Sequence, residues 1–154
     1  MAWQLNATEY RAWRAFLDAH ARLMRQLEKE LVADDGMTLA EFDVLIQLWA
    51  ADDRRLRMTD LSERVRLSPS GITRLVDRLV RMGLVKRGHC ASDRRGTWAI
   101  LTTSGRERVE RARPLHLAGV HRHFGGRLTS GQLRTLTVAL EQVAEAERAK
   151  VSST

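Results

Sequence analysis

The stretch SPSGITRLVDRLVRMG, residues 68–83, has the start, the spacing and the stop of one amphipathic helix. Ser68 is a typical N-cap, Pro69 takes the first helical position, and Gly83 is a typical residue just past a helix end. At the helical step of about 100° per residue, the apolar side chains fall on one arc that we expect to face a core. They are Ile72, Leu75, Val76, Leu79 and Val80.

The opposite arc of this helix is polar, with three arginines against one aspartate. Its residues are Ser70, Thr73, Arg74, Asp77, Arg78 and Arg81. Such a face suits the major groove of DNA, because an α-helix fits the groove and arginine can donate two hydrogen bonds to guanine. In isolation the pattern fits an ordinary surface helix better, so the flanking sequence has to decide.

The flanking segments favour a winged helix-turn-helix. TDLSERVRL, residues 59–67, predicts a short helix with Thr59 or Asp60 as its cap, and only RLS, residues 66–68, separates it from the next helix. LVKRGH, residues 84–89, and TWAIL, residues 97–101, have the composition of two strands. A hairpin directly behind a helix-turn-helix forms a wing.

The rest of the chain is predicted to be mostly helical. Residues 6–33 have the apolar spacing of one long helix, and LRM, residues 56–58, fits a very short strand. Pro114 is expected to kink a later helix. The expected helix starts are Thr38 with Glu41, Thr102 or Thr103, and Thr129 with Gln132. The predicted fold class is mainly α with a small β-hairpin wing (α+β).

The positive charge of the chain lies in one block. The 154 residues are 44% apolar with a formal net charge of +7. Residues 54–101 hold twelve Lys and Arg against four Asp and Glu, a net of +8, so the remainder carries −1. A localised basic block indicates a polyanion-binding surface. Arginine used as a general surface residue would give the same composition, so charge alone leaves both readings open.

Several functional classes lack their sequence signals. The chain has no signal-peptide pattern and no apolar run near the roughly 18 residues of a membrane span, and its single cysteine excludes an intramolecular disulfide. We therefore expect a cytoplasmic protein, associated with the nucleoid when bound to DNA. The sequence contains no Gly-rich phosphate loop, zinc-protease motif or nucleophile elbow, so neither an enzyme nor a cofactor is expected.

The chain resembles the MarR family of winged-helix transcriptional regulators. The matching pieces are residues 37–45, residues 56–87 and DRRGTWAILTTSGR, residues 93–106, which is similar to the family's wing signature. The resemblance implies a homodimer formed through the terminal helices, and a repressor by family default. It divides the chain into an N-terminal dimerisation helix (1–36), a DNA-binding lobe (37–101) and C-terminal dimerisation helices (102–154).

The resemblance also implies which residues contact DNA. On the recognition helix they are Ser68, Pro69, Ser70, Thr73, Arg74 and Arg78. In the wing, Arg95 would enter the minor groove, Arg94 would contact a phosphate, Asp93 would brace the loop and Gly96 would form its turn. A two-fold dimer implies a pseudo-palindromic operator in double-stranded DNA, with half-sites about one helical turn apart.

Regulation by a small molecule is a further expectation. Many relatives bind aromatic or phenolic acids, and Trp13, His20, Trp49 and His116 could line such a cleft here. The alternative is that Trp13 and Trp49 belong to the core or to a dimer interface.

Two other switches and two rival functions are weighed against this expectation. Cys90, at the wing base, could sense oxidants, but an incidental thiol is expected. His116, His121 and His123 do not converge on one helix face, so no metal site is expected. The rival functions are a ligand-independent or redox-responsive regulator and a nonspecific architectural DNA-binding protein. A winged helix used for protein interaction would not need so basic a lobe.

Overall fold

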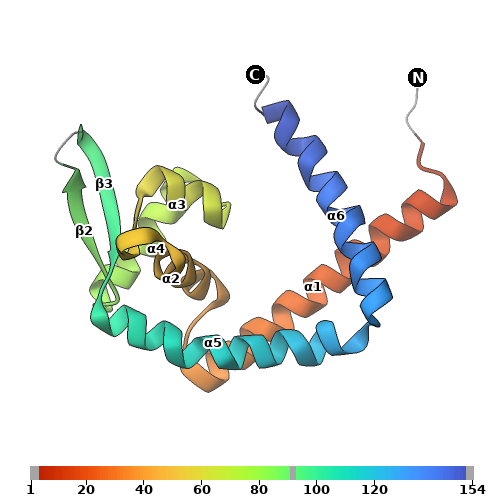
Figure 1. The fold of residues 1–154 in the computed structure, drawn as a ribbon, viewed down its shortest axis with the longest axis horizontal. Coiled ribbons are helices and arrows are strands. Elements are labelled where there is room, and N and C mark those ends of the chain that lie inside the picture. Colours follow the sequence, from red (N-terminus) through yellow and green to blue (C-terminus); the bar gives the residue numbers. More distant parts are fainter. Residues whose placement is uncertain (1–3, 91–92, 152–154) are drawn as a thin grey trace. The chain divides into compact units, whose positions relative to one another are not determined.

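The computed structural model describes residues 4–90 and 93–151, with side chains for residues 4–89 and 97–146. The chain forms two compact units, residues 1–117 and 118–154. The first unit contains α1 (Ala7–Asp35), α2 (Leu39–Ala50), β1 (Arg55–Arg57), α3 (Met58–Val65), α4 (Pro69–Arg81), β2 (Val85–Cys90), β3 (Asp93–Leu101) and most of α5 (Thr103–His123). The end of α5 and α6 (Ser130–Val151) belong to the second unit. The predicted winged helix-turn-helix order is confirmed (Figure 1).

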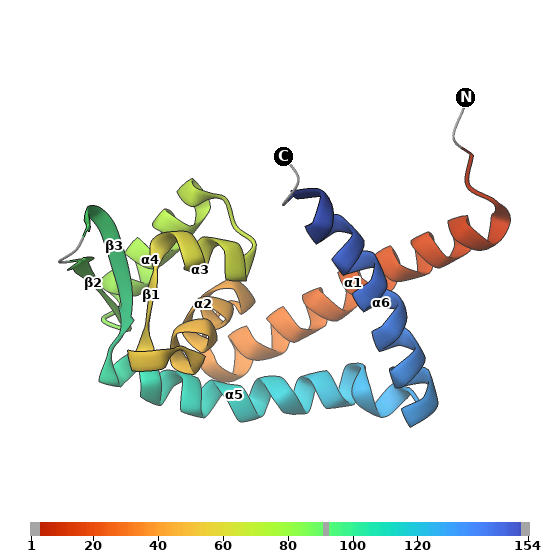
Figure 2. The same cartoon turned by 45° about the horizontal axis from the view of Figure 1, so that its top comes forward.

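The sheet is antiparallel, with the strand order β1-β3-β2. Pairing places Leu56 opposite Ala99 and Val85 opposite Leu101, and all four side chains are buried on one face. Helices α2, α3 and α4 pack against this sheet, and β1 lies along β3 (Figure 2). The wing is therefore anchored in the same core as the helices.

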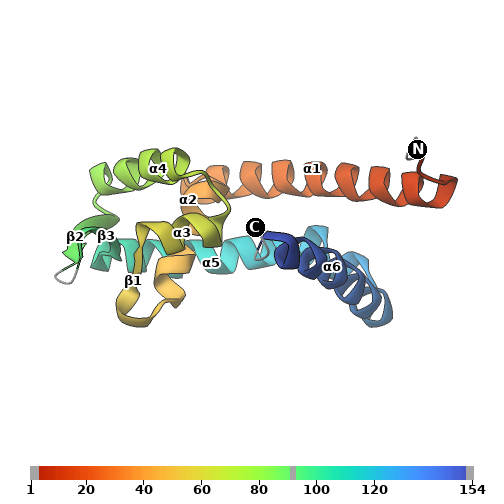
Figure 3. The same ribbon diagram turned by 90° about the horizontal axis from the view of Figure 1, so that it is seen from above.

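The helix-turn-helix connection is held by Ser62 of α3. Its hydroxyl donates a 2.6 Å hydrogen bond to the carbonyl of Leu67, and the N–H of Leu67 donates to the carbonyl of Ser62 at 3.1 Å. Arg66 ends α3 in the left-handed conformation, with φ of 55°. Figure 3 shows the two helices in succession across this short turn. The turn is tight because these contacts close it from both sides.

The start of α3 differs from the sequence prediction. The helix begins at Met58, directly after β1, and the side chain of Arg57, the N-cap residue, does not cap the helix. Thr59 and Asp60 lie inside the helix instead, so the prediction that one of them caps it was wrong. The chain enters α3 straight from a strand, which leaves no residue free to act as a side-chain cap.

Helix α4 turns its predicted apolar face inward. Ile72, Val76 and Leu79 are buried, and Leu75 is half-buried. Val80 is the exception, because it lies at the margin of the arc and is exposed. The predicted start and stop are confirmed: Ser68 caps the helix, Pro69 takes its first position, and Gly83 follows the C-cap with φ of 73°.

The start of α5 is locked to the turn that follows α4. Thr102 donates from its N–H to the carbonyl of Leu84 at 3.1 Å and from its hydroxyl to the carbonyl of Gly83 at 2.7 Å. The same hydroxyl accepts from the N–H of Gly105 at 3.0 Å, so Thr102 is the helix cap. A Cβ atom on Gly105 would lie 2.1 Å from the carbonyl oxygen of Leu84. Only glycine fits this close approach.

The long helices also begin and end as their local signals indicate. Asn6 caps α1, and the capping boxes of Thr38 with Glu41 and of Thr129 with Gln132 are both formed. Arg108 of α5 binds the carboxylate of Asp35 at the end of α1, with 2.6 Å between Nε and Oδ2. Helix α5 continues through Pro114. In the part of the chain that the structure describes, no helix is long and apolar enough to cross a membrane.

Candidate nucleic-acid interface

The outward face of α4 is exposed at every position predicted to contact DNA. These positions are Ser68, Pro69, Ser70, Thr73, Arg74 and Arg78. Two hydroxyls near the start of the helix are already engaged: Ser68 accepts from the N–H of Gly71 at 3.1 Å, and Thr73 donates to the carbonyl of Pro69 at 2.8 Å. These bonds order the N-terminal end of α4, and in a recognition helix this end faces the base edges.

The cations on this face differ in how freely they can bind a ligand. Arg74 and Arg81 make no hydrogen bond or ion pair with other described residues. Asp77, the acid of the predicted arc, accepts two hydrogen bonds from Arg87 of β2, at 3.1 and 2.8 Å. Because Asp77 is neutralised from the sheet, it does not draw Arg74 away from a phosphate or a base.

Arg78 occupies a different environment from Arg74. Its side chain is 57% exposed, but its Nε lies 2.8 Å from Oε1 of Glu41, whose side chain is 1% exposed. The sequence identified Glu41 only as part of a capping box. Its second contact joins α2 to α4 and was not predicted.

The wing is present as the β2–β3 hairpin, paired up to Cys90 and Asp93. The side chains of Cys90, Asp93, Arg94 and Arg95, and the surroundings of Gly96, lie outside the described residues. Their proposed roles therefore remain predictions from the sequence.

The described base of the wing carries one feature that the sequence analysis did not single out. Arg55 and Arg57 of β1 lie over the ring of Trp98, at 4.9 and 5.6 Å from its centroid. Stacking of this kind fixes two cations on the outer face of the sheet.

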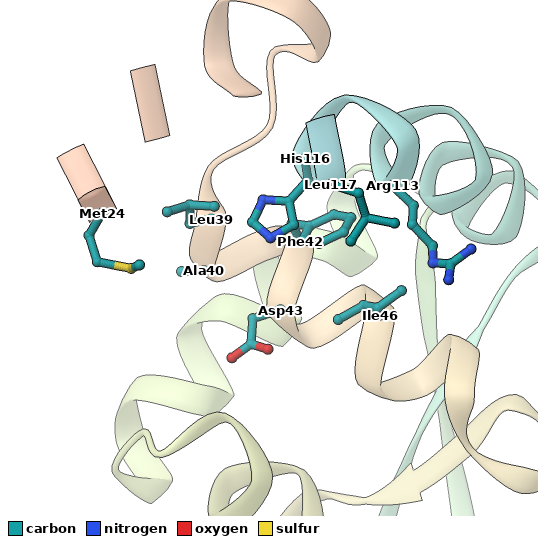
Figure 4. A pocket seen from close by; sticks show the side chains of 9 residues that line it. All are labelled: Met24, Leu39, Ala40, Phe42, Asp43, Ile46, Arg113, His116 and Leu117. Atoms are coloured by element: carbon teal, nitrogen blue, oxygen red, sulfur yellow. The ribbon is translucent and has the colours of Figure 1, made fainter. Parts of the chain in front are cut away.

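A pocket of about 480 Å³ lies between α1, α2 and α5 of the first unit (Figure 4). Its lining is mostly apolar and consists of Met24, Leu39, Ala40, Phe42, Asp43, Ile46, Arg113, His116 and Leu117. The volume falls in the usual range for small-molecule sites. The ring of His116 lies 4.8 Å from that of Phe42.

Burial shifts His116 toward its neutral form, and one of its ring nitrogens has no hydrogen-bond partner in the described part of the chain. Burial lowers the pKa of His116 below its ordinary value of 6.5, and the nearby carboxylate of Asp43 opposes this only in part. Its Nδ1 is buried without a hydrogen-bond partner among the described residues. Arg113, one turn earlier on α5, supplies a positive charge at the same pocket. The site thus offers an apolar slot, a neutral imidazole and a guanidinium.

Of the four residues predicted to bind a ligand, His116 lines this pocket and the other three do not. Trp13 and His20 lie on α1, exposed and flanking Phe16 at ring distances of 6.0 and 6.2 Å. Two guanidinium groups lie over the ring of Trp49, that of Arg54 at 5.1 Å and that of Arg113 at 5.4 Å from its centroid. Trp49 therefore touches the pocket only through Arg113, a residue that the sequence analysis missed.

His116 belongs to the pocket of the first unit, and His121 to the second unit. No group of three or more His, Cys, Asp or Glu residues that could hold a metal ion occurs among the described residues. In the second unit, the His121 ring instead packs beside Gly125 and Gly126.

Comparisons with known proteins agree on one family. A sequence model of the MarR family matches residues 35–96. The chain is similar to AbsC, a MarR family transcriptional regulator from Streptomyces coelicolor, with a TM-score of 0.90 and 36% identity over 96% of this chain and 99% of that one. Sco3205 from the same organism, solved in complex with DNA, gives a TM-score of 0.90 and 35% identity over 95% of this chain and 91% of that one.

The transcriptional repressor YetL from Bacillus subtilis is a curated relative. It is 33% identical over 100 residues, which are 65% of this chain and 60% of YetL. The match to YetL therefore spans less than two thirds of that relative.

Proposed function

Because the chain belongs to the MarR family of transcriptional regulators, we propose that it binds double-stranded DNA sequence-specifically as a homodimer and represses transcription. The observation that carries the proposal is the outward face of α4, where every predicted contact residue is exposed while the opposite face lies in the core. The likeness to Sco3205, which was solved in complex with DNA, supports it.

In this proposal α4 is the recognition helix. Its N-terminal turn enters the major groove, where the backbone N–H groups and the helix dipole favour a phosphate. Arg74 is free to donate two hydrogen bonds to the edge of a guanine. In the wing, Arg94 contacts a phosphate of the DNA backbone and Arg95 enters the minor groove, whose negative potential attracts arginine. Asp93 and Gly96 shape that loop.

A homodimer is supported by exposed apolar side chains on the terminal helices. On α1, Tyr10 and Trp13 are 55% and 52% exposed, and on α6, Val138 and Val143 are 65% and 64% exposed. Apolar surface on this scale commonly marks an interface. Two-fold symmetry then presents two copies of α4 to half-sites about one helical turn apart.

The pocket supports control by a small aromatic or phenolic acid. Arg113 would pair with the carboxylate, and the neutral His116 would share a hydrogen bond with a ring hydroxyl. Since Arg113 also stacks on Trp49, a bound acid should change the fluorescence of Trp49. Titration with salicylate tests this role: we expect quenching in the wild type and none in Trp49→Phe or Arg113→Ala. Equal quenching in all three proteins would show that salicylate binds outside this pocket.

Selection of bound duplexes from a random pool tests the main proposal. We expect enrichment of a pseudo-palindrome, occupied by two chains. A redox-responsive regulator would instead lose this DNA after peroxide treatment in the wild type but not in Cys90→Ser. A nonspecific architectural protein would enrich no sequence at all, and that outcome would refute the proposal.

A further inference from the structure

Glu41 is a buried carboxylate at the contact between α2 and α4. Its Oε2 accepts a hydrogen bond from the N–H of Thr38 at 2.9 Å, as one half of the capping box. Its Oε1 is buried and makes no hydrogen bond with any residue that the structure describes. Arg78 Nε lies 2.8 Å from this oxygen. The positive charge of Arg78 therefore balances the charge of the buried Glu41 carboxylate.

This pairing restricts where the Arg78 guanidinium can lie. A buried carboxylate is costly unless a partner neutralises it, so the ion pair with α2 favours positions of Arg78 close to Glu41. Arg78 approaches through Nε, the inner edge of its guanidinium, while 57% of the side chain remains exposed. The two terminal nitrogens carry four of the five donors of the group and make no hydrogen bond with a residue that the structure describes.

We propose that Glu41 is a positioning residue for DNA binding: it holds Arg78 so that the terminal nitrogens meet a backbone phosphate beside the major groove. This inference rests on the proposed role of α4 as recognition helix. An arginine loses side-chain entropy when it binds, and one already held by Glu41 has lost part of it beforehand. The planar fork then matches the oxygens of a phosphate.

Arg74 provides the contrast on the same face of the helix. It has no partner among the described residues and can adapt to a base edge, whereas Arg78 is held by an atom of another helix. Asp77, the acid that could compete for Arg78, is engaged by Arg87. The effect of Glu41 on DNA binding should therefore pass through Arg78 and not through Arg74.

A double-mutant cycle on affinity for the selected operator tests the proposal. Glu41→Gln keeps the shape and an oxygen for the N–H of Thr38, but removes the charge. We expect Arg78→Ala to weaken binding about tenfold and to lower the salt slope by about 1. Glu41→Gln should weaken binding about threefold in the wild type, roughly half of that free-energy effect, and cause no further loss in Arg78→Ala.

Two controls separate positioning from loss of folding. Arg78→Lys keeps a charge at Glu41 but lacks the fork, so it should melt like the wild type and still lose affinity. Glu41→Gln combined with Arg74→Ala should show the product of the two single effects. If Glu41→Gln has no effect, or the same effect with and without Arg78, the positioning role is wrong. If the wild type binds no duplex, the proposed function fails as well.

Discussion

Replacing Gly105 with alanine tests whether the start of α5 is locked to the turn after α4. The new Cβ atom would lie 2.1 Å from the carbonyl oxygen of Leu84 and 2.7 Å from Cδ1 of Leu101. Since neighbours at such a contact rarely come closer than 3.0 Å, the helix must move by about 1 Å away from a backbone atom. That movement strains the three hydrogen bonds of Thr102, at 2.7, 3.0 and 3.1 Å.

The expected cost follows from those bonds. At about 1 kcal/mol each they contribute roughly 3 kcal/mol, and the helix propensity of alanine returns up to about 1 kcal/mol. We therefore expect Gly105→Ala to lower the free energy of unfolding by about 2 to 3 kcal/mol, and the melting temperature by roughly 5 to 10 °C. Urea unfolding followed by circular dichroism, at one protein concentration, measures the change.

Gly131→Ala is the matched control. Gly131 lies in the first turn of α6, and its added Cβ would have its nearest neighbour at 4.0 Å. The midpoint of unfolding of this control should lie at the same urea concentration as that of the wild type, or slightly above it. If Gly105→Ala also unfolds there, with the same slope, the junction yields without cost and the locking argument is refuted.

The remaining predictions concern a turn, a titration and the wing. Arg66 has a φ of 55°, a left-handed conformation that glycine adopts at lower cost, so Arg66→Gly should raise the free energy of unfolding by about 1 kcal/mol in the same urea assay. A lower free energy of unfolding would show that the backbone at Arg66 is not strained. Burial lowers the pKa of His116, so the unfolded chain takes up its proton first as pH falls through 6.5. Between pH 7.5 and 5.5 the melting temperature of the wild type should therefore fall further than that of His116→Gln. Equal decreases would show that the titration of His116 does not cause the loss of stability. Arg95→Ala should weaken operator binding in a mobility-shift titration without lowering the melting temperature, and an unchanged Kd would exclude the wing from the mechanism.

The elements with local signals could be predicted from the sequence. Ser68, Pro69 and Gly83 fix the bounds of α4 because caps, proline and glycine act on the backbone within one turn. The capping box of Thr38 with Glu41 is equally local. The buried face of α4 followed from helical periodicity, except at Val80, which lies at the margin of the apolar arc and is exposed.

Contacts between distant segments could not be predicted in the same way. The pair of Glu41 and Arg78 joins residues 37 positions apart, and nothing in either local pattern indicates it. Arg113 reaches the pocket because α5 packs near α2, which periodicity does not specify. The start of α3 was missed because β1 pairs with β3 through Arg57, the residue just before the helix. This long-range pairing overrode the preference of Thr59 and Asp60 for a cap position.

The central claim is that this chain recognises a DNA sequence, and the ratio of two dissociation constants tests it most directly. The Kd of the wild-type protein should be measured for the selected operator and for a scrambled duplex of equal length, at one salt concentration near physiological. We expect the operator to bind at least about a thousandfold more tightly than the scrambled duplex. A ratio near one would contradict it and would indicate a protein that binds DNA only through its charge.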